Sequence, residues 1–289
     1  MTALWLAFYL VFFPATAPTG YQAQIEDWRV KREAALKAEN GWLSVAGLFW
    51  LHEGDNAAGS NPEAVVVLPA GAKSIGAFRF VSGKASFMPA AGAAVYWNGT
   101  PVRGPVVLKS DEGGTNPDAL TYLDTTMTVI KRGTRHAVRM RDKNSQMRRD
   151  FTGLHWYPVR EDLRFEARFV TYDKPKMIPV PNILNEVEES KSMGYAVFTY
   201  QGQEYTLEPV VEGDQLFYIF KDMTAGKETY PAGRFVYSDL PKNGHVILDF
   251  NKAYNPPCAF TPYATCPLPP KQNRLAVRLE AGELKYGNH

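Results

Sequence analysis

The stretch that decides the fold is Tyr195-Ala-Val-Phe-Thr-Tyr-Gln-Gly-Gln-Glu-Tyr-Thr-Leu-Glu-Pro-Val-Val-Glu-Gly-Asp-Gln-Leu-Phe-Tyr-Ile-Phe220. Three runs rich in aromatic and β-branched residues, at 195–200, 204–210 and 216–220, alternate with polar turns that each contain a glycine. Aromatic and β-branched side chains favour extended backbone, and glycine supplies the positive φ of tight hairpin turns. The stretch therefore predicts three consecutive antiparallel strands.

The same rhythm of short strands and polar turns extends through most of the chain. Residues 127–130 and 136–140 flank a glycine-containing turn and predict a hairpin, and further strands are expected at 234–237 and 246–250. Closely spaced strands are typical of an antiparallel barrel or sandwich, whereas a parallel sheet would need helices between its strands. We expect a mainly β protein whose residues 21–289 form a single antiparallel barrel or sandwich domain.

One helix is expected before the strands, over Gln22–Ala38. Trp28, Arg32 and Leu36 recur at helical spacing, and Asn40-Gly41 is a natural stop. We expect this helix to pack Trp28 and Leu36 across one end of a sheet.

The N-terminus has the character of an export signal. The apolar run Ala3–Phe13 is shorter than the about 20 residues that a membrane span requires, and Ala15-Thr-Ala17 has the small-x-small form of a cleavage site. We expect residues 1–20 to be a signal peptide or N-terminal hydrophobic segment of an exported protein, periplasmic or secreted, with no membrane span in the mature chain. The alternative is a mis-assigned start, which would leave the protein in the cytoplasm.

Composition excludes several classes of function. Hydrophobic residues make up 45% and charged residues 21%, and the formal net charge of +2 gives no reason to expect nucleic acid as a partner. The chain has neither a phosphate-cradling glycine motif nor a dinucleotide fingerprint. Cys-x₂-Cys and His-x₃-His spacings are also missing, so no metal site is expected.

A proline-rich loop follows the last expected strand, at Leu248–Pro270. Proline fixes φ and reduces the entropy lost on ordering, so we expect this apolar loop to fold onto the body and close one end of it. It holds both cysteines, Cys258 and Cys266. Export favours a disulfide between them, and buried packing thiols are the alternative. A metal-binding or nucleophilic role has no supporting pattern.

Four blocks of this sequence resemble the family of mostly bacterial, uncharacterised proteins called DUF1684. They are the loop signature Asp249-Phe-Asn-Lys-Ala-Tyr-Asn-Pro-Pro-Cys-Ala-Phe260 with Cys266-Pro-Leu-Pro-Pro270 and Asn273-Arg-Leu275, and the segments 41–54, 139–151 and 220–234. The resemblance covers roughly Trp28 to Glu283 and implies no known activity.

An arginine-rich strand is the first candidate site. Side chains alternate along a strand, so Arg135, Arg139 and Arg141 share one face, and guanidinium suits bidentate binding of carboxylate or phosphate. An anion-binding wall is one interpretation. A solvated face, or pairing with Asp142, Asp150 and Glu161, is the other.

Polar loops after the strands supply the remaining candidates. Asp142, Ser145 and Arg148 form one group, and Tyr230 with Arg234 a second, with turn capping as the plain explanation for Asp142 and Ser145. Asp249 is expected to face inward, where its carboxylate needs either several hydrogen-bond donors or a charged partner such as Arg234 or Arg141, unless it is protonated.

These residues predict a pocket for a small, anionic molecule. We expect it to be lined by Arg139, Arg141, Asp142, Ser145, Arg148, Tyr230, Arg234, Asp249, Asn251, Tyr254 and Asn255. One alternative is a hydrolase with Asp249 as base and Arg141, Arg148 and Arg234 holding the negative charge of the substrate. The other is a structural envelope protein without a ligand.

Overall fold

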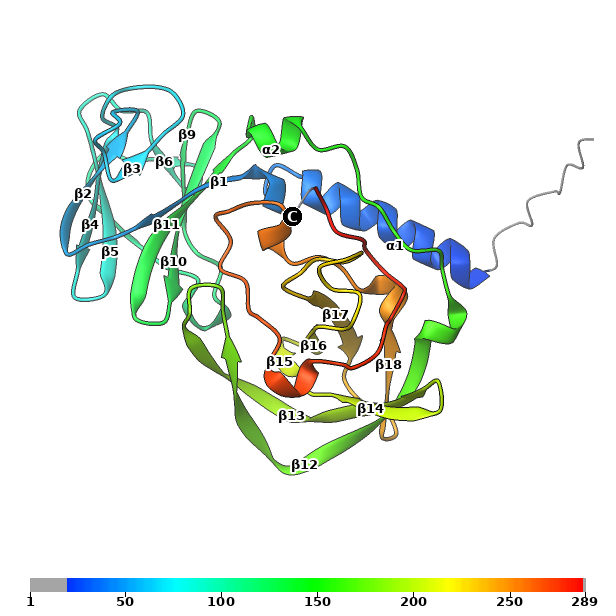
Figure 1. The fold of residues 1–289 in the computed structure, drawn as a ribbon. Helices are drawn as coiled ribbons and strands as arrows, with labels where there is room; N and C mark the ends of the chain where they lie inside the picture. Colours follow the sequence, from blue (N-terminus) through cyan, green and yellow to red (C-terminus); the bar gives the residue numbers. More distant parts are fainter. Residues whose placement is uncertain (1–19, 288–289) are drawn as a thin grey trace, which may run out of the picture.

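The computed structural model describes residues 20–287. The predicted signal segment, residues 1–20, therefore lies outside the described residues except for its last position. The described chain is mainly β, with one long helix, α1 (Gly20–Lys37), at its start (Figure 1). This confirms the expected helix within two residues. None of the helices within 20–287 has the length and apolar character needed to cross a bilayer.

The N-terminal half contains two sheets that enclose one apolar core. Six strands are ordered β1 (Val45–Trp50), β11 (Arg135–Asp142), β10 (Thr125–Arg132), β9 (Ala119–Tyr122), β6 (Tyr96–Trp97) and β7 (Thr100–Pro101). Five more are ordered β3 (Val66–Val67), β2 (Gly54–Gly59), β4 (Gly76–Val81), β5 (Lys84–Pro89) and β8 (Val106–Leu108). Phe78, Phe87 and Val138 are fully buried between them.

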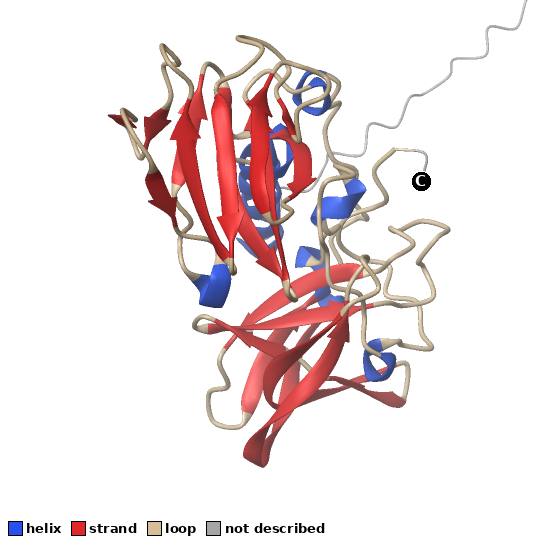
Figure 2. Cartoon of the chain, turned by 90° about the vertical axis from the view of Figure 1, so that its left-hand side faces the viewer, coloured by secondary structure: helices blue, strands red, loops and turns tan. Residues whose placement is uncertain are grey.

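The C-terminal half is built from a four-stranded and a three-stranded sheet. The first is ordered β14 (Gln203–Leu207), β13 (Val187–Tyr200), β12 (Arg164–Pro181) and β18 (His245–Asp249). The second contains β15 (Val210–Glu212), β16 (Gln215–Phe220) and β17 (Arg234–Asp239). Figure 2 shows the strands of the two halves as separate groups. A second core, which includes Phe198, Tyr218 and Phe250, lies in this half.

The mainly β class is confirmed, but the barrel alternative of the predicted barrel or sandwich is wrong, because each half has separate sheets and none closes on itself among the described residues. The deciding stretch shows why. Its first turn joins β13 to β14 in one sheet, but Glu208-Pro209 then carries the chain into the other sheet, where β15 pairs with β16. Proline has no N–H for a ladder hydrogen bond, so the strand expected over 204–210 is broken there. The β10–β11 hairpin is confirmed.

The proline-rich loop is folded onto the body, as predicted. Phe260 packs with Leu36 of α1 and with Leu43, and Cys266 packs with Phe217 and Phe235 of the C-terminal half. Helix α1 lies along one side of that half (Figure 1). The ring centroids of Trp28 and Trp156 are 5.6 Å apart. The single-domain expectation stays a prediction, which these shared contacts favour.

Candidate functional site

The arginine-rich strand faces the C-terminal half. Val138 and Met140 of β11 point into the N-terminal core, so Arg135 and Arg139 occupy the opposite face, as the alternation predicts. Arg132 of β10 is paired with Arg135 and therefore lies on this face too. It donates from Nε to Thr265 Oγ1 at 2.9 Å, across the junction of the halves. The face is buried at Arg139, whereas the side chain of Arg135 at its edge is 46% exposed.

The partners of these arginines differ from those expected. Arg132 forms an ion pair with Asp111 at 2.9 Å, and Arg135 pairs with Glu186 at 2.8 Å. Asp142, by contrast, accepts the backbone N–H of Asn144. The physical reason is that the fold brings partners from elsewhere to this face: Glu186 and Thr265 from the C-terminal half, and Asp111 from the loop that follows β8.

Arg139 is an unusual member of the face because it is 94% buried, with 6% of its surface exposed. Its guanidinium lies over Trp42 at 5.1 Å from the ring centroid. Nε and Nη2 have no hydrogen-bond partner among residues 20–287. Burial, reinforced by the charges of Arg132 and Arg141, lowers the pKa of Arg139 to about 10.

A cavity of about 370 Å³ opens where α1, the two halves and the proline-rich loop meet. We call it the aromatic cavity. It is lined by Arg32, Trp42, Arg132, Glu212, Phe217, Phe235, Tyr237, Tyr254, Pro257, Thr265, Cys266 and Pro267. The rings of Phe217 and Tyr237 are stacked with centroids 4.7 Å apart, and Tyr237 is stacked on Tyr254 at 6.4 Å. A flat ligand would find ring faces on several sides.

The charges at the aromatic cavity are mixed. Arg32 lies 4.5 Å above the ring of Tyr254 and is 3.5 Å from the buried Glu283. Glu212 accepts a hydrogen bond of 2.6 Å from the Tyr237 hydroxyl. Burial, the neighbouring Tyr254 and this carboxylate raise the pKa of Tyr237, so its hydroxyl stays a donor.

A second cavity, of about 460 Å³, adjoins the aromatic one. The two share the lining residues Arg132, Glu212, Phe217, Thr265 and Pro267. Beyond them, Asn182, Glu188, Ser190 and Lys191 give the second cavity a polar lining. The ring-lined space therefore continues into a space suited to polar groups.

Of the predicted site residues, only Tyr254 lines the aromatic cavity, and Arg139 lies behind its wall at Trp42. Arg141 and Arg148 instead hold the end of α1. Arg141 Nε donates to the carbonyl of Asn40 at 3.2 Å, and Arg148 Nε donates to that of Lys37 at 3.0 Å. Cations at the C-terminus of a helix satisfy its last carbonyls and complement its dipole.

The polar loops have structural partners. Ser145 is the N-cap of the short helix α2 (Gln146–Arg149), which confirms turn capping. Arg234 is 1% exposed and contacts Asp222 at 3.4 Å and the carbonyl of Leu279 at 3.0 Å. The Tyr230 hydroxyl donates to the carbonyl of Cys258 at 3.1 Å.

Asp249 faces inward as expected, but not towards an arginine. It accepts the hydroxyl of Tyr21 at 2.8 Å and the backbone N–H of Asn251 at 3.1 Å. Asn251 in turn exchanges hydrogen bonds with the backbone of Arg160, at 2.8 and 2.7 Å. The expected pairing of Asp249 with Arg234 or Arg141 is therefore wrong, because neutral donors from α1 and the loop satisfy the carboxylate.

The two cysteines lie side by side as thiols. The backbone N–H of Cys258 donates to Cys266 Sγ at 3.1 Å, and Cys266 lines the aromatic cavity. A hydrogen bond between the two side chains lowers the pKa of Cys258 and raises that of Cys266.

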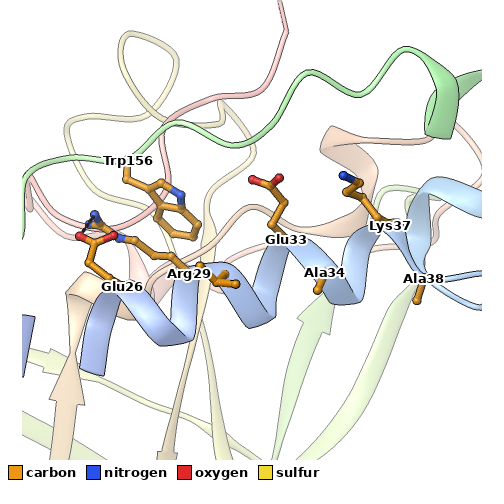
Figure 3. Close-up of a pocket in the computed structure, with 8 residues that line it drawn as sticks. Glu26, Arg29, Glu33, Ala34, Lys37, Ala38 and Trp156 are labelled. Atoms are coloured by element: carbon orange, nitrogen blue, oxygen red, sulfur yellow. Dashed lines mark hydrogen bonds and ion pairs between the residues drawn. The ribbon is translucent and has the colours of Figure 1, made fainter. Parts of the chain in front are cut away.

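Another groove, of about 620 Å³, runs along the outer side of α1 (Figure 3). Glu26, Arg29 and Glu33 of this groove are already engaged. Arg29 pairs with Glu26 at 3.0 Å and lies 5.0 Å from the ring centroid of Trp156, while Glu33 accepts the backbone N–H of Leu154. This groove is therefore a weaker candidate for a ligand site than the aromatic cavity.

Within residues 20–287, no three His, Cys, Asp or Glu side chains gather in a group that could hold a metal ion.

Sequence reasoning missed most of the aromatic cavity. The position of Arg32 was informative, because this charged residue lies four residues from both Trp28 and Leu36, on the face of α1 where an apolar residue is expected. Phe217, Phe235 and Tyr237 read as ordinary strand residues, and nothing in their local sequence distinguishes ring faces that line a cavity from ring faces that fill a core.

Comparison with known proteins identifies a family for the chain but no activity. No curated protein matches it. It is similar to an uncharacterised protein from Haloarcula marismortui whose structure was solved by solution NMR, with 30% identity over 47% of this chain and 78% of that one and a TM-score of 0.40. Residues 149–284 match the family described as "Protein of unknown function (DUF1684)". The matched range includes the loop signature and the segment 220–234. The chain therefore belongs to the DUF1684 family.

Proposed function

We propose that the aromatic cavity binds a small anion with a flat, apolar body. The observation that carries this proposal is the cavity of about 370 Å³ in which five aromatic side chains surround two arginines. Small-molecule sites are typically concave, mostly apolar and fitted with a few convergent polar groups, and their volumes begin at about 300 Å³.

The sign of the ligand charge follows from the arginines. Arg32 and Arg132 line the aromatic cavity, and Arg139 lies behind Trp42 with two guanidinium nitrogens unbonded among the described residues. Guanidinium groups held this close repel one another, and an anion between them relieves that repulsion. Glu212, the one carboxylate of the lining, is engaged by Tyr237.

Calorimetric titration with three naphthalene probes of matched shape tests the proposal. 2-Naphthalenesulfonate is anionic, 2-naphthol is neutral and 2-naphthylmethylamine is cationic at pH 7. We expect saturable binding of the sulfonate at one site, weaker binding of the naphthol and none of the amine. Arg132→Gln should weaken sulfonate binding about tenfold or more, because a hydrogen bond to a charged group contributes about 1.5–3 kcal/mol.

The matched control is Arg168→Gln. Arg168 is exposed and pairs with Glu204 at 3.7 Å, and it is not among the residues that line the aromatic cavity. It should bind the sulfonate like the wild type. Equal binding of the amine, or undiminished binding by Arg132→Gln with a native near-UV spectrum, would overturn the proposal. Failure of all three probes would favour the structural envelope protein instead.

The hydrolase alternative loses its proposed machinery. Asp249 contacts Tyr21 and Asn251, while Arg234 pairs with Asp222 and Arg148 holds the end of α1. The acid and the arginines are thus engaged in separate places, and no observation on the described residues assembles them around a substrate.

A further inference from the structure

Glu283 is a fully buried carboxyl group behind the aromatic cavity. Its side chain is 0% exposed, and neither oxygen has a hydrogen-bond partner among residues 20–287. The preceding Gly282 has φ +82°, and a Cβ there would fall 2.4 Å from the carbonyl oxygen of Ala253. Only glycine fits this turn, so the backbone path into Glu283 is fixed.

Asn255 is the neighbour that makes Glu283 informative. Its Nδ2 donates to the carbonyl of Leu284 at 2.7 Å, which leaves Oδ1 as the free acceptor. That Oδ1 is buried and receives no hydrogen bond from the described chain. Asn255 lies beside the Glu283 carboxylate, and its amide oxygen has no donor of its own. When Glu283 is protonated, its carboxyl O–H is a donor of the kind that Asn255 Oδ1 lacks.

Three other ionisable groups face Glu283. Arg32 comes from α1, Arg234 from β17 and Tyr254 from the proline-rich loop. Arg234 is engaged with Asp222, and burial raises the pKa of Tyr254 to about 12, so it stays neutral. Arg32 favours the carboxylate, but burial outweighs it and raises the pKa of Glu283 to about 7.

The charge of Arg32 reaches the aromatic cavity. Its guanidinium lies over the ring of Tyr254 and is among the groups that line this space. When Glu283 is ionised, its negative charge offsets the positive charge of Arg32 from the side away from the cavity. When Glu283 is protonated, the positive charge of Arg32 is available to an anion in the cavity.

We propose that Glu283 and Asn255 form a proton-binding site that controls the charge presented by Arg32, so that anion binding is coupled to proton uptake. This inference rests on the proposed function and adds its regulation. Linkage is reciprocal: the anion binds more tightly when Glu283 is protonated, and Glu283 holds its proton more tightly when the anion is bound.

Titration of the full chain with 2-naphthalenesulfonate between pH 5.5 and 8.5 tests the coupling, because this probe is ionised throughout. We expect the Kd to rise about tenfold across the range, within the span of measured couplings between sites. Glu283→Gln should keep the tight value at all pH, since its amide donates to Asn255 without titrating. Glu204→Gln, an exposed control, should show the wild-type dependence. A wild-type Kd that is constant with pH would overturn the coupling.

A second measurement separates the proton site from the function. In protein labelled with ¹³C at the Glu carboxyl carbons, the signal missing from Glu283→Gln identifies Glu283. Titration near pH 7 supports the proton site, and titration near the ordinary 4.5 overturns it. If the sulfonate fails to bind at every pH, the coupling fails together with the proposed function, while this titration still decides whether Glu283 holds a proton.

Discussion

A buried carboxyl group makes the stability of this protein fall as pH rises. The pKa of Glu283 is raised from 4.5 to about 7 in the folded chain, so between these values the folded state binds more protons than the unfolded state. Stability is then lost as pH increases through this window, the reverse of the behaviour of a carboxylate in an ordinary ion pair.

Replacement of Glu283 by Gln should abolish this loss. At pH 8 we expect the free energy of unfolding to rise by about 3 kcal/mol, because a folded pKa of about 7 in place of 4.5 corresponds to a destabilisation of about that size once the carboxyl is ionised. At pH 4.5 the variant and the wild type should differ little, because both side chains are neutral. Urea unfolding at the two pH values measures the difference, and an equal effect at both would show that Glu283 ionises normally.

Arg139 offers a second prediction at this scale. Arg139→Met removes a buried charge with two unbonded nitrogens and keeps the packing volume. Replacing buried charges by apolar groups of similar size is often neutral or stabilising, by about 1–4 kcal/mol. We therefore expect a more stable protein that binds 2-naphthalenesulfonate more weakly. Urea unfolding and calorimetry measure both quantities, and a loss of stability would show that Trp42 holds the guanidinium more firmly than its desolvation costs.

Among the elements, local pattern predicted the helix and the β10–β11 hairpin, because spacing and turn residues are contained within each segment. The pairing of sheets was not predictable in the same way. The run 204–210 has strand composition throughout, yet Pro209 divides it between two sheets. Which edge receives the continuing strand depends on contacts across the fold that no local pattern encodes.

The proline-rich loop was predictable as an ordered element but not in its contacts. Its composition indicated burial, which Phe260 and Cys266 confirm. Its partners come from distant segments: Thr261 donates to the carbonyl of Val45 at 3.0 Å, and Thr265 accepts from Arg132. The site was missed for the same reason, since Tyr254 alone of the residues predicted to line a pocket reaches the aromatic cavity.

The loop also carries a redox prediction. Cys258 and Cys266 lie together as thiols, so oxidation should join them with little movement of the loop. In protein exported to an oxidising compartment and purified without reductant, we expect an intact mass about 2 Da below that of the dithiol. Cys266→Ala, which leaves Cys258 without its partner, should show no such deficit. A full dithiol mass for the exported wild type would identify the pair as packing thiols.

For the whole molecule, the two cores raise the question of cooperativity. Each half has its own apolar core, but Trp42, Cys266 and Phe260 are packed by segments from both sides of the junction. Unfolding either half would expose this shared surface. We therefore expect one calorimetric transition whose van't Hoff and calorimetric enthalpies agree. Two resolved transitions would show that the halves are independent domains.

The walls of the aromatic cavity come from opposite ends of the chain, Arg32 and Trp42 near its beginning and Tyr254 and Cys266 near its end. The ribosome makes a protein from its N-terminus, and domains fold as they emerge. A nascent or truncated chain that lacks the late segments has no such cavity, even if its earlier strands have already formed. A ligand that binds in the cavity therefore stabilises complete chains and not truncated ones, so ligand binding distinguishes the two.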